Sequence, residues 1–101
     1  MRIEVRNRVT MSLDLVVAEV APSRGGRRAW MMIRPSEDGR IMLVEFEHDA
    51  ALDTDSWPAP DDIVDRRRMD FDTLDEVIEH LSGRGVETDR FDAPWKVDYP
   101  L

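Results

Sequence analysis

The sequence of 101 residues contains no cysteine, only one lysine and no long apolar run. Without cysteine the chain has no disulfide framework, no thiolate nucleophile and no sulfur ligand for zinc. Its longest uninterrupted apolar stretch is the five residues 29–33, far too short to cross a membrane. The N-terminus opens with Arg2, Glu4 and Arg6 and lacks the apolar core of a secretion signal. We therefore expect a cytoplasmic protein.

Length and composition favour a single domain over residues 1–101. Two independent cores would each fall below the usual minimum size, and 42% apolar residues are enough to build one core. Fourteen basic residues against 22 acidic ones give a net charge of −8. Because nucleic acids and anionic membranes are themselves negative, we expect neither as the main partner.

The charge is distributed unevenly along the chain. Residues 1–44 carry eight arginines against five acids, a net charge of +3. Residues 45–101 carry seventeen acids against six basic residues, a net charge of −11. Such an asymmetry indicates an interaction surface, with ordinary solubility as the alternative explanation.

Alternating polar and apolar residues predict several β-strands. Residues 2–20 alternate without glycine or proline, so they are predicted to form one long bent strand or two strands joined near residues 7–10. Turn-forming residues at 22–26 and 35–39 bound two further strands, residues 27–34 and 40–47. In the second of these, one face is predicted to hold Met42, Val44 and Phe46, and the other Ile41, Leu43, Glu45 and Glu47.

Helical patterns follow the strands. A short helix is predicted from Asp61 or Asp62 to Arg68, in which the arginines at 66–68 pair with neighbouring aspartates. A stronger helix signal begins at Thr73, which forms a capping box with Glu76, and ends at the glycines of residues 83–85. Its apolar face is formed by Leu74, Val77, Ile78 and Leu81.

Residues 86–91 predict a last short strand and residues 94–101 an extended tail. The expected fold class is therefore α+β, an antiparallel β-meander of three to five strands with one or two helices packed on one face. Within the strand at 27–34, Trp30 and Met32 point to one face and Met31 to the other. We expect core packing there; an open sheet face would instead offer an interface for a homodimer.

No catalytic, metal or cofactor motif is found in the sequence. A calcium loop beginning at Asp53 fails at Trp57, Pro58 and Val64, where an oxygen ligand, glycine and glutamate are needed. His80 falls in the last turn of the predicted helix, where the helix dipole favours its charged form. His48 can pair with Glu47 or Asp49, but no nucleophile or oxyanion hole accompanies it. We expect a protein that is not an enzyme and binds no metal or cofactor.

The most informative stretch is residues 45–62, which combines seven carboxylates with one tryptophan. Carboxylates steer a basic partner at a high rate, and tryptophan is a frequent interface hot spot; packing of the tryptophan into the core is the alternative. The candidate partner-binding residues are Glu45, Glu47, Asp49, Asp53, Asp55, Trp57, Asp61 and Asp62.

In size, lack of cysteine, α+β pattern and this carboxylate cluster, the chain resembles the small acidic immunity proteins that bacteria pair with polymorphic toxins. The resemblance implies an inhibitor that occludes the basic active site of a cognate toxin, a nuclease or a deaminase, with carboxylates in place of substrate phosphates. The alternatives are a phage or host DNA mimic that inhibits a nucleic-acid-binding enzyme, and a homodimeric accessory domain. The expected partner is thus a basic protein, and the chain itself a monomer or a homodimer.

Overall fold

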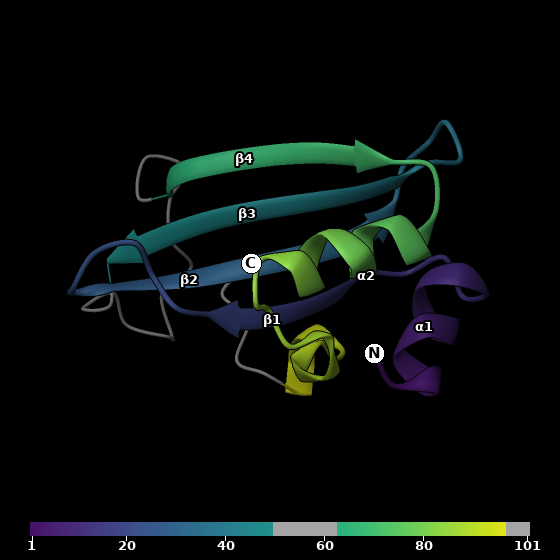
Figure 1. Ribbon diagram of the computed structural model, residues 1–101, viewed down its shortest axis with the longest axis horizontal. Helices are drawn as coiled ribbons and strands as arrows, with labels where there is room; N and C mark the ends of the chain where they lie inside the picture. The colour runs from purple at the N-terminus through teal and green to yellow at the C-terminus, as the bar shows by residue number, and fades with distance from the viewer. Residues whose placement is uncertain (50–62, 97–101) are drawn as a thin grey trace.

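The computed structural model describes residues 1–49 and 63–96, which form a four-stranded antiparallel sheet with helices on one face (Figure 1). The strands are adjacent in chain order: β1 (Val16–Val20), β2 (Arg27–Pro35), β3 (Ile41–Asp49) and β4 (Val64–Phe71). The helices are α1 (Ile3–Thr10) and α2 (Leu74–Gly83), with two 3-10 turns, η2 (Thr88–Arg90) and η3 (Pro94–Lys96). The predicted α+β meander is confirmed.

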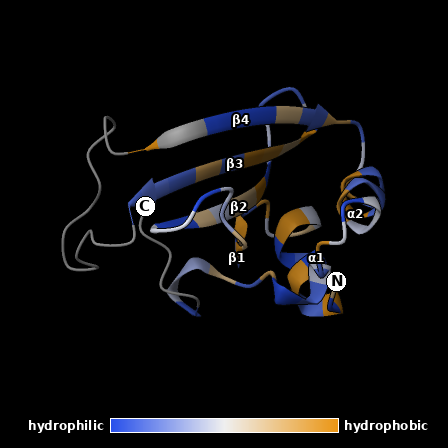
Figure 2. Ribbon diagram, turned by 60° about the vertical axis from the view of Figure 1, so that its left-hand side comes forward, coloured by the Kyte–Doolittle hydropathy of each residue, from blue (hydrophilic) through white to orange (hydrophobic). Residues whose placement is uncertain are grey.

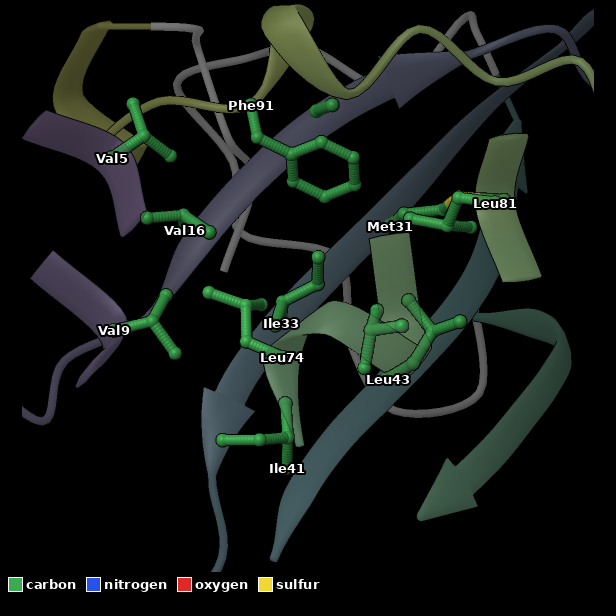
Figure 3. Packing of buried hydrophobic residues seen from close by; sticks show 12 residues of the cluster. Val5, Val9, Val16, Met31, Ile33, Ile41, Leu43, Leu74, Leu81 and Phe91 are labelled. Carbon is green, nitrogen blue, oxygen red and sulfur yellow. The ribbon is translucent and has the colours of Figure 1, made fainter. Parts of the chain in front are cut away.

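The main core lies between the sheet and the two helices. Val5 and Val9 of α1 and Leu81 of α2 pack against residues of β1, β2 and β3, with Phe91 beside them (Figure 3). Met31 belongs to this cluster and is 2% exposed. Because α1 and α2 bury their apolar side chains in one cluster, both helices cover the same face of the sheet.

The opposite face of the sheet has its own apolar cluster, formed by Trp30, Met42, Val44 and Phe46. The predicted alternation along β3 is therefore confirmed, and Trp30 and Met31 point to opposite faces as expected. Trp30 is 0% exposed. Both residues are buried within one copy of the chain, so the expected core packing of this strand is confirmed.

The prediction of strand structure across residues 2–20 is wrong for its first half, since residues 3–10 form α1 and the strand begins only at Val16. Val5 and Val9 explain the error. Residues four apart share a face both in a strand and in a helix, so the pair fits either structure. Ile3 distinguishes the two: a strand would bury it with Val5, whereas α1 leaves it 67% exposed.

The chain turns from α1 into β1 through Leu13, the only described non-glycine residue with a positive φ, at 52°. This left-handed conformation costs a side-chain-bearing residue roughly 1–2 kcal/mol. The Leu13 side chain is 71% exposed and so recovers little of that cost through burial. We therefore expect Leu13→Gly to raise the free energy of unfolding by up to about 1 kcal/mol, measured by urea denaturation.

Met11, at the C-cap of α1 with φ −107°, is the matched control. It is 75% exposed, and glycine there relieves no strain but increases the freedom of the unfolded chain. Met11→Gly should therefore lower stability by roughly 0.5–1 kcal/mol. Equal effects of the two substitutions would contradict the strain at Leu13.

Two further predictions from the sequence are corrected. The helix predicted from Asp61 or Asp62 to Arg68 is wrong for residues 64–68, which belong to β4 and pair with β3; Asp61 and Asp62 lie outside the described residues. Residues 86–91 do not form a strand; they contain η2, and the strand-like contact is a single bridge between Val17 and Asp92. Figure 2 shows why β4 is hard to detect, since it is blue, and so hydrophilic, over much of its length.

Helix α2 begins and ends as the sequence predicts. The Thr73 hydroxyl accepts the backbone N–H of Glu76, and the Glu76 carboxylate accepts the backbone N–H of Asp72. At the other end the N–H groups of Gly85 and Val86 bond to the carbonyls of Ser82 and Leu81, which is a Schellman motif. Gly85 takes the left-handed φ of 77° that this motif requires. The cap fixes the direction in which Arg84 leaves the helix.

Candidate functional site

The predicted partner-binding residues fall into two groups. Glu45, Glu47 and Asp49 lie in the second half of β3. The other five lie outside the described residues: Asp53, Asp55, Trp57, Asp61 and Asp62. We call this end of the sheet the Asp49 end; β1 ends there, β2 begins there, and β4 begins opposite Glu47.

Glu45 is bound by Arg84, the residue at the C-terminal end of α2. Both of its carboxylate oxygens accept hydrogen bonds from Arg84, at 2.7 and 3.0 Å, in the bidentate geometry that suits a guanidinium. The Glu45 side chain is only 17% exposed. These hydrogen bonds raise the pKa of Arg84 above its ordinary value. Glu45 therefore fastens the end of α2 to the sheet, and its charge is neutralised within the chain.

Glu47 is more deeply buried and less fully bonded. Among residues 1–49 and 63–96, its two oxygens share one donor, the backbone N–H of Ser23, at 3.2 and 3.3 Å. The nearest guanidinium nitrogen, Nη1 of Arg27, is 3.9 Å away, beyond hydrogen-bond length. The side chain of Glu47 is 12% exposed. It is thus a buried carboxylate with unused acceptor capacity.

A cleft of about 470 Å³ lies beside these two carboxylates, on the helix-covered face at the Asp49 end. Part of its wall is apolar and comes from Val20, Ala21, Ala29, Met31 and Val86. This volume lies in the range typical of ligand sites.

Charged groups line the rest of the cleft. Glu45 and Glu47 face guanidinium groups contributed by Arg67, Arg84 and Arg90. Arg90 is paired with Glu87 at 3.5 Å, and its side chain is 65% exposed. Glu45 and Glu47 therefore lie in the interior of the cleft, whereas the Arg90–Glu87 pair lies near the solvent.

His48 does not pair with a carboxylate of Glu47 or Asp49, contrary to that prediction. Its Nε2 accepts the indole N–H of Trp30 at 3.0 Å, and its Nδ1 lies 3.0 Å from the backbone carbonyl of Asp49. Because an indole N–H only donates, Nε2 must be unprotonated and Nδ1 must carry the proton. His48 is 4% exposed and links β2 to β3.

The three consecutive arginines are displayed on an edge strand instead of a helix. Arg66, Arg67 and Arg68 are all exposed on β4, and the Arg68 guanidinium lies 3.3 Å from Asp70. Arg67 is paired in register with Glu45 of β3. The expected ion pairing with aspartates is therefore found in the described residues only for Arg68.

The second histidine is in the last turn of α2, as predicted, but it makes few polar contacts. The buried Nε2 of His80 has no hydrogen-bond partner in the described part of the chain, and the His80 ring centroid lies 5.3 Å from that of Phe71. The residues of the structure outside 50–62 and 97–101 contain no group of three or more His, Cys, Asp or Glu side chains placed to hold a metal ion. None of the described helices is both long and apolar enough to cross a bilayer.

Sequence reasoning found Glu45 and Glu47 but missed the groups around them. Arg84 lies 39 residues from Glu45, and Ser23 lies 24 residues before Glu47. Nothing in the local pattern links these positions. Arg84 meets Glu45 only when α2 packs on the sheet, and Ser23 meets Glu47 only when the turn between β1 and β2 lies beside β3. No protein-family model, curated protein or solved structure matches this chain.

Proposed function

We propose that this chain is a non-enzymatic acidic binding protein whose partner is a basic protein, of the type represented by the immunity proteins of bacterial toxin systems. Its role would be to occlude the basic active site of a nuclease or deaminase toxin. The carboxylates would occupy positions that substrate phosphates take in the uninhibited toxin.

One feature of the charge carries this proposal. Residues 50–62 contain four aspartates and no basic residue, so these thirteen residues hold half of the net charge of −8. In the described residues, 17 acidic side chains are nearly balanced by 14 basic ones. Many of these form ion pairs with each other, as Arg84 does with Glu45 and Arg28 with Glu19. The surplus charge is therefore concentrated in one segment of the chain.

The internal pairing narrows the candidate surface. Glu45 and Glu47 are largely buried, and Glu45 is fully engaged by Arg84, so they add little to long-range attraction. We attribute the attraction of a basic partner mainly to Asp53, Asp55, Asp61 and Asp62, which carry the surplus negative charge of residues 50–62. Such attraction raises the association rate and weakens as salt is added.

The test uses the purified product of the reading frame next to this gene as the binding partner. We expect the double charge reversal Asp53→Lys with Asp55→Lys to slow association by roughly tenfold at low salt. The association rate of the variant should also depend less steeply on salt than that of the unmodified chain. Both quantities come from stopped-flow or surface-binding kinetics over a salt series.

The control is a second double variant that changes the net charge by the same amount at positions away from the Asp49 end. Glu37 lies in the turn between β2 and β3, at the end of the sheet opposite the Asp49 end, and Glu79 lies on the exposed side of α2. The double variant Glu37→Lys with Glu79→Lys should slow association much less. If both double variants slow it equally, net charge alone is responsible; if neither changes it, the proposed surface is wrong.

A further inference from the structure

The carboxylate of Glu47, buried in the cleft at the Asp49 end, accepts fewer hydrogen bonds than it can. An ionised carboxylate has about four acceptor positions, and among the described residues Glu47 receives one shared N–H at 3.2 and 3.3 Å. Arg27 at 3.9 Å is too distant to complete the set by hydrogen bonding. Arg27 therefore acts on Glu47 only as a nearby charge, at the outer limit of an ion pair, and the acceptor positions of Glu47 stay largely unfilled by the described residues. A cation with N–H donors that entered the cleft would fill them and offset the cost of burying this carboxylate.

The arrangement of the other charges favours a cation over an anion. Arg84 is already engaged by both oxygens of Glu45, and its side chain is 39% exposed. Arg90 is 65% exposed and pairs with Glu87. Arg67, the third arginine of the lining, is exposed on β4. The arginines of the lining thus lie toward solvent, and Arg84 and Arg90 are already paired, whereas the 12% exposed Glu47 is inside the cleft beside Arg27. An anion that reached the interior would meet this carboxylate.

The walls of the cleft suit an alkyl chain that ends in a positive charge. Val20, Ala21 and Val86 provide apolar surface next to the carboxylates. Lysine and arginine side chains bury their methylene stems against such surface and keep the charged end for a polar partner. A small neutral apolar group could contact the same apolar surface but would leave the acceptor positions of Glu47 unfilled.

We infer that this cleft is the receptor for a single lysine or arginine side chain of the basic partner, with Glu47 as its counter-charge. The inference rests on the proposed function and specifies its short-range contact. The aspartates of residues 53–62 attract the partner over a distance, and the cleft then fixes the register of the complex by holding one side chain.

The test measures the cleft by itself with small probes. Nα-acetyl-lysine amide is titrated into the labelled protein, and binding is followed by NMR shifts of the backbone amides of Ser23 and Glu47. Nα-acetyl-norleucine amide, which has a similar stem without the charge, is the reference probe. We expect the lysine probe to bind at least about tenfold more tightly than the norleucine probe.

Glu47→Gln should remove this preference, because glutamine keeps an oxygen for the Ser23 N–H but has no charge. Glu37→Gln, with the same change of charge at the opposite end of the sheet, should leave the preference unchanged. A second variant, Ala21→Phe, keeps every charge and narrows the cleft, and it should weaken binding of both probes. Unchanged NMR dispersion of the remaining amides shows that each variant is folded.

The outcomes separate this inference from the proposed function. If the lysine probe binds no better than norleucine, or if Glu47→Gln binds it equally well, the cleft is not a receptor for a basic side chain. The partner could still associate through Asp53 and Asp55, in which case the proposed function stands. If the lysine probe binds as described but no basic partner is found, the proposed function fails while the cleft assignment holds.

Discussion

Replacing Phe91 by alanine is expected to lower the free energy of unfolding by about 3–5 kcal/mol, the usual cost of removing a buried phenyl ring. Phe91 is 0% exposed and lies among Val5 of α1 and Val16 of β1 (Figure 3). Domains of this size are stable by only about 5–15 kcal/mol. The substitution should therefore remove a large part of the stability and shift the urea midpoint strongly to lower concentration.

Trp95→Ala is the control for this substitution. Trp95 is a still larger aromatic residue, only four positions further along the chain, but it is 72% exposed. Its ring stacks under the guanidinium of Arg8 at 4.5 Å, a contact worth about 0.5–1 kcal/mol at an exposed site. If Phe91→Ala costs no more than Trp95→Ala, the segment after α2 is not part of the core.

The position of Phe91 depends on contacts between the two ends of the described chain. Arg2 donates to the carboxylate of Asp92 at 2.6 Å and to the carbonyl of Phe91 at 3.3 Å. The hydrogen bond from Arg2 holds the pKa of Asp92 below its usual range. The backbone groups of Asp92 also bond to those of Val17, which joins this segment to β1. None of these partners lies near residues 86–92 in the sequence, which is why the segment was predicted as an ordinary strand.

Features set by neighbouring residues were predictable. The turn glycines, the alternation in β3 and the Thr73–Glu76 cap each depend on a few consecutive positions, and all are found in the structure. The first helix was not predictable, because the four-residue spacing of Val5 and Val9 fits both periodicities. Strand β4 was missed since its arginines show no apolar alternation, and only pairing with β3 makes it a strand.

The candidate site, too, could be predicted only in part from the sequence. Composition located the carboxylates of β3 but not the groups that bond to them. Glu45 is engaged by Arg84 across the cleft, and Glu47 reaches the turn between β1 and β2 through Ser23. Glu45, which the sequence suggests as a charge available to a partner, is instead used to hold α2 on the sheet. Ala21, which no sequence pattern singles out, forms part of the cleft wall. Recognition of such a site requires the tertiary contacts.

The buried hydrogen bond between Trp30 and His48 should contribute a measurable coupling to stability. His48→Leu removes the acceptor that the structure gives to the indole N–H of Trp30, and an unmatched buried donor costs about 1–3 kcal/mol. Trp30→Phe removes the donor instead and leaves space where the indole was. When both are replaced, no unmatched donor remains, so the double variant should lose less stability than the two single variants together.

A double-mutant cycle of urea denaturation measures this difference, which we expect to be about 1–2 kcal/mol. His48→Gln is the informative third variant, because its amide oxygen supplies an acceptor again, and it should be more stable than His48→Leu. The bond links β2 to β3 on the sheet face away from the helices, so its loss tests that face independently of Phe91. If the stability losses of the two single variants sum to that of the double variant within about 0.5 kcal/mol, the hydrogen bond makes no contribution to stability beyond side-chain packing.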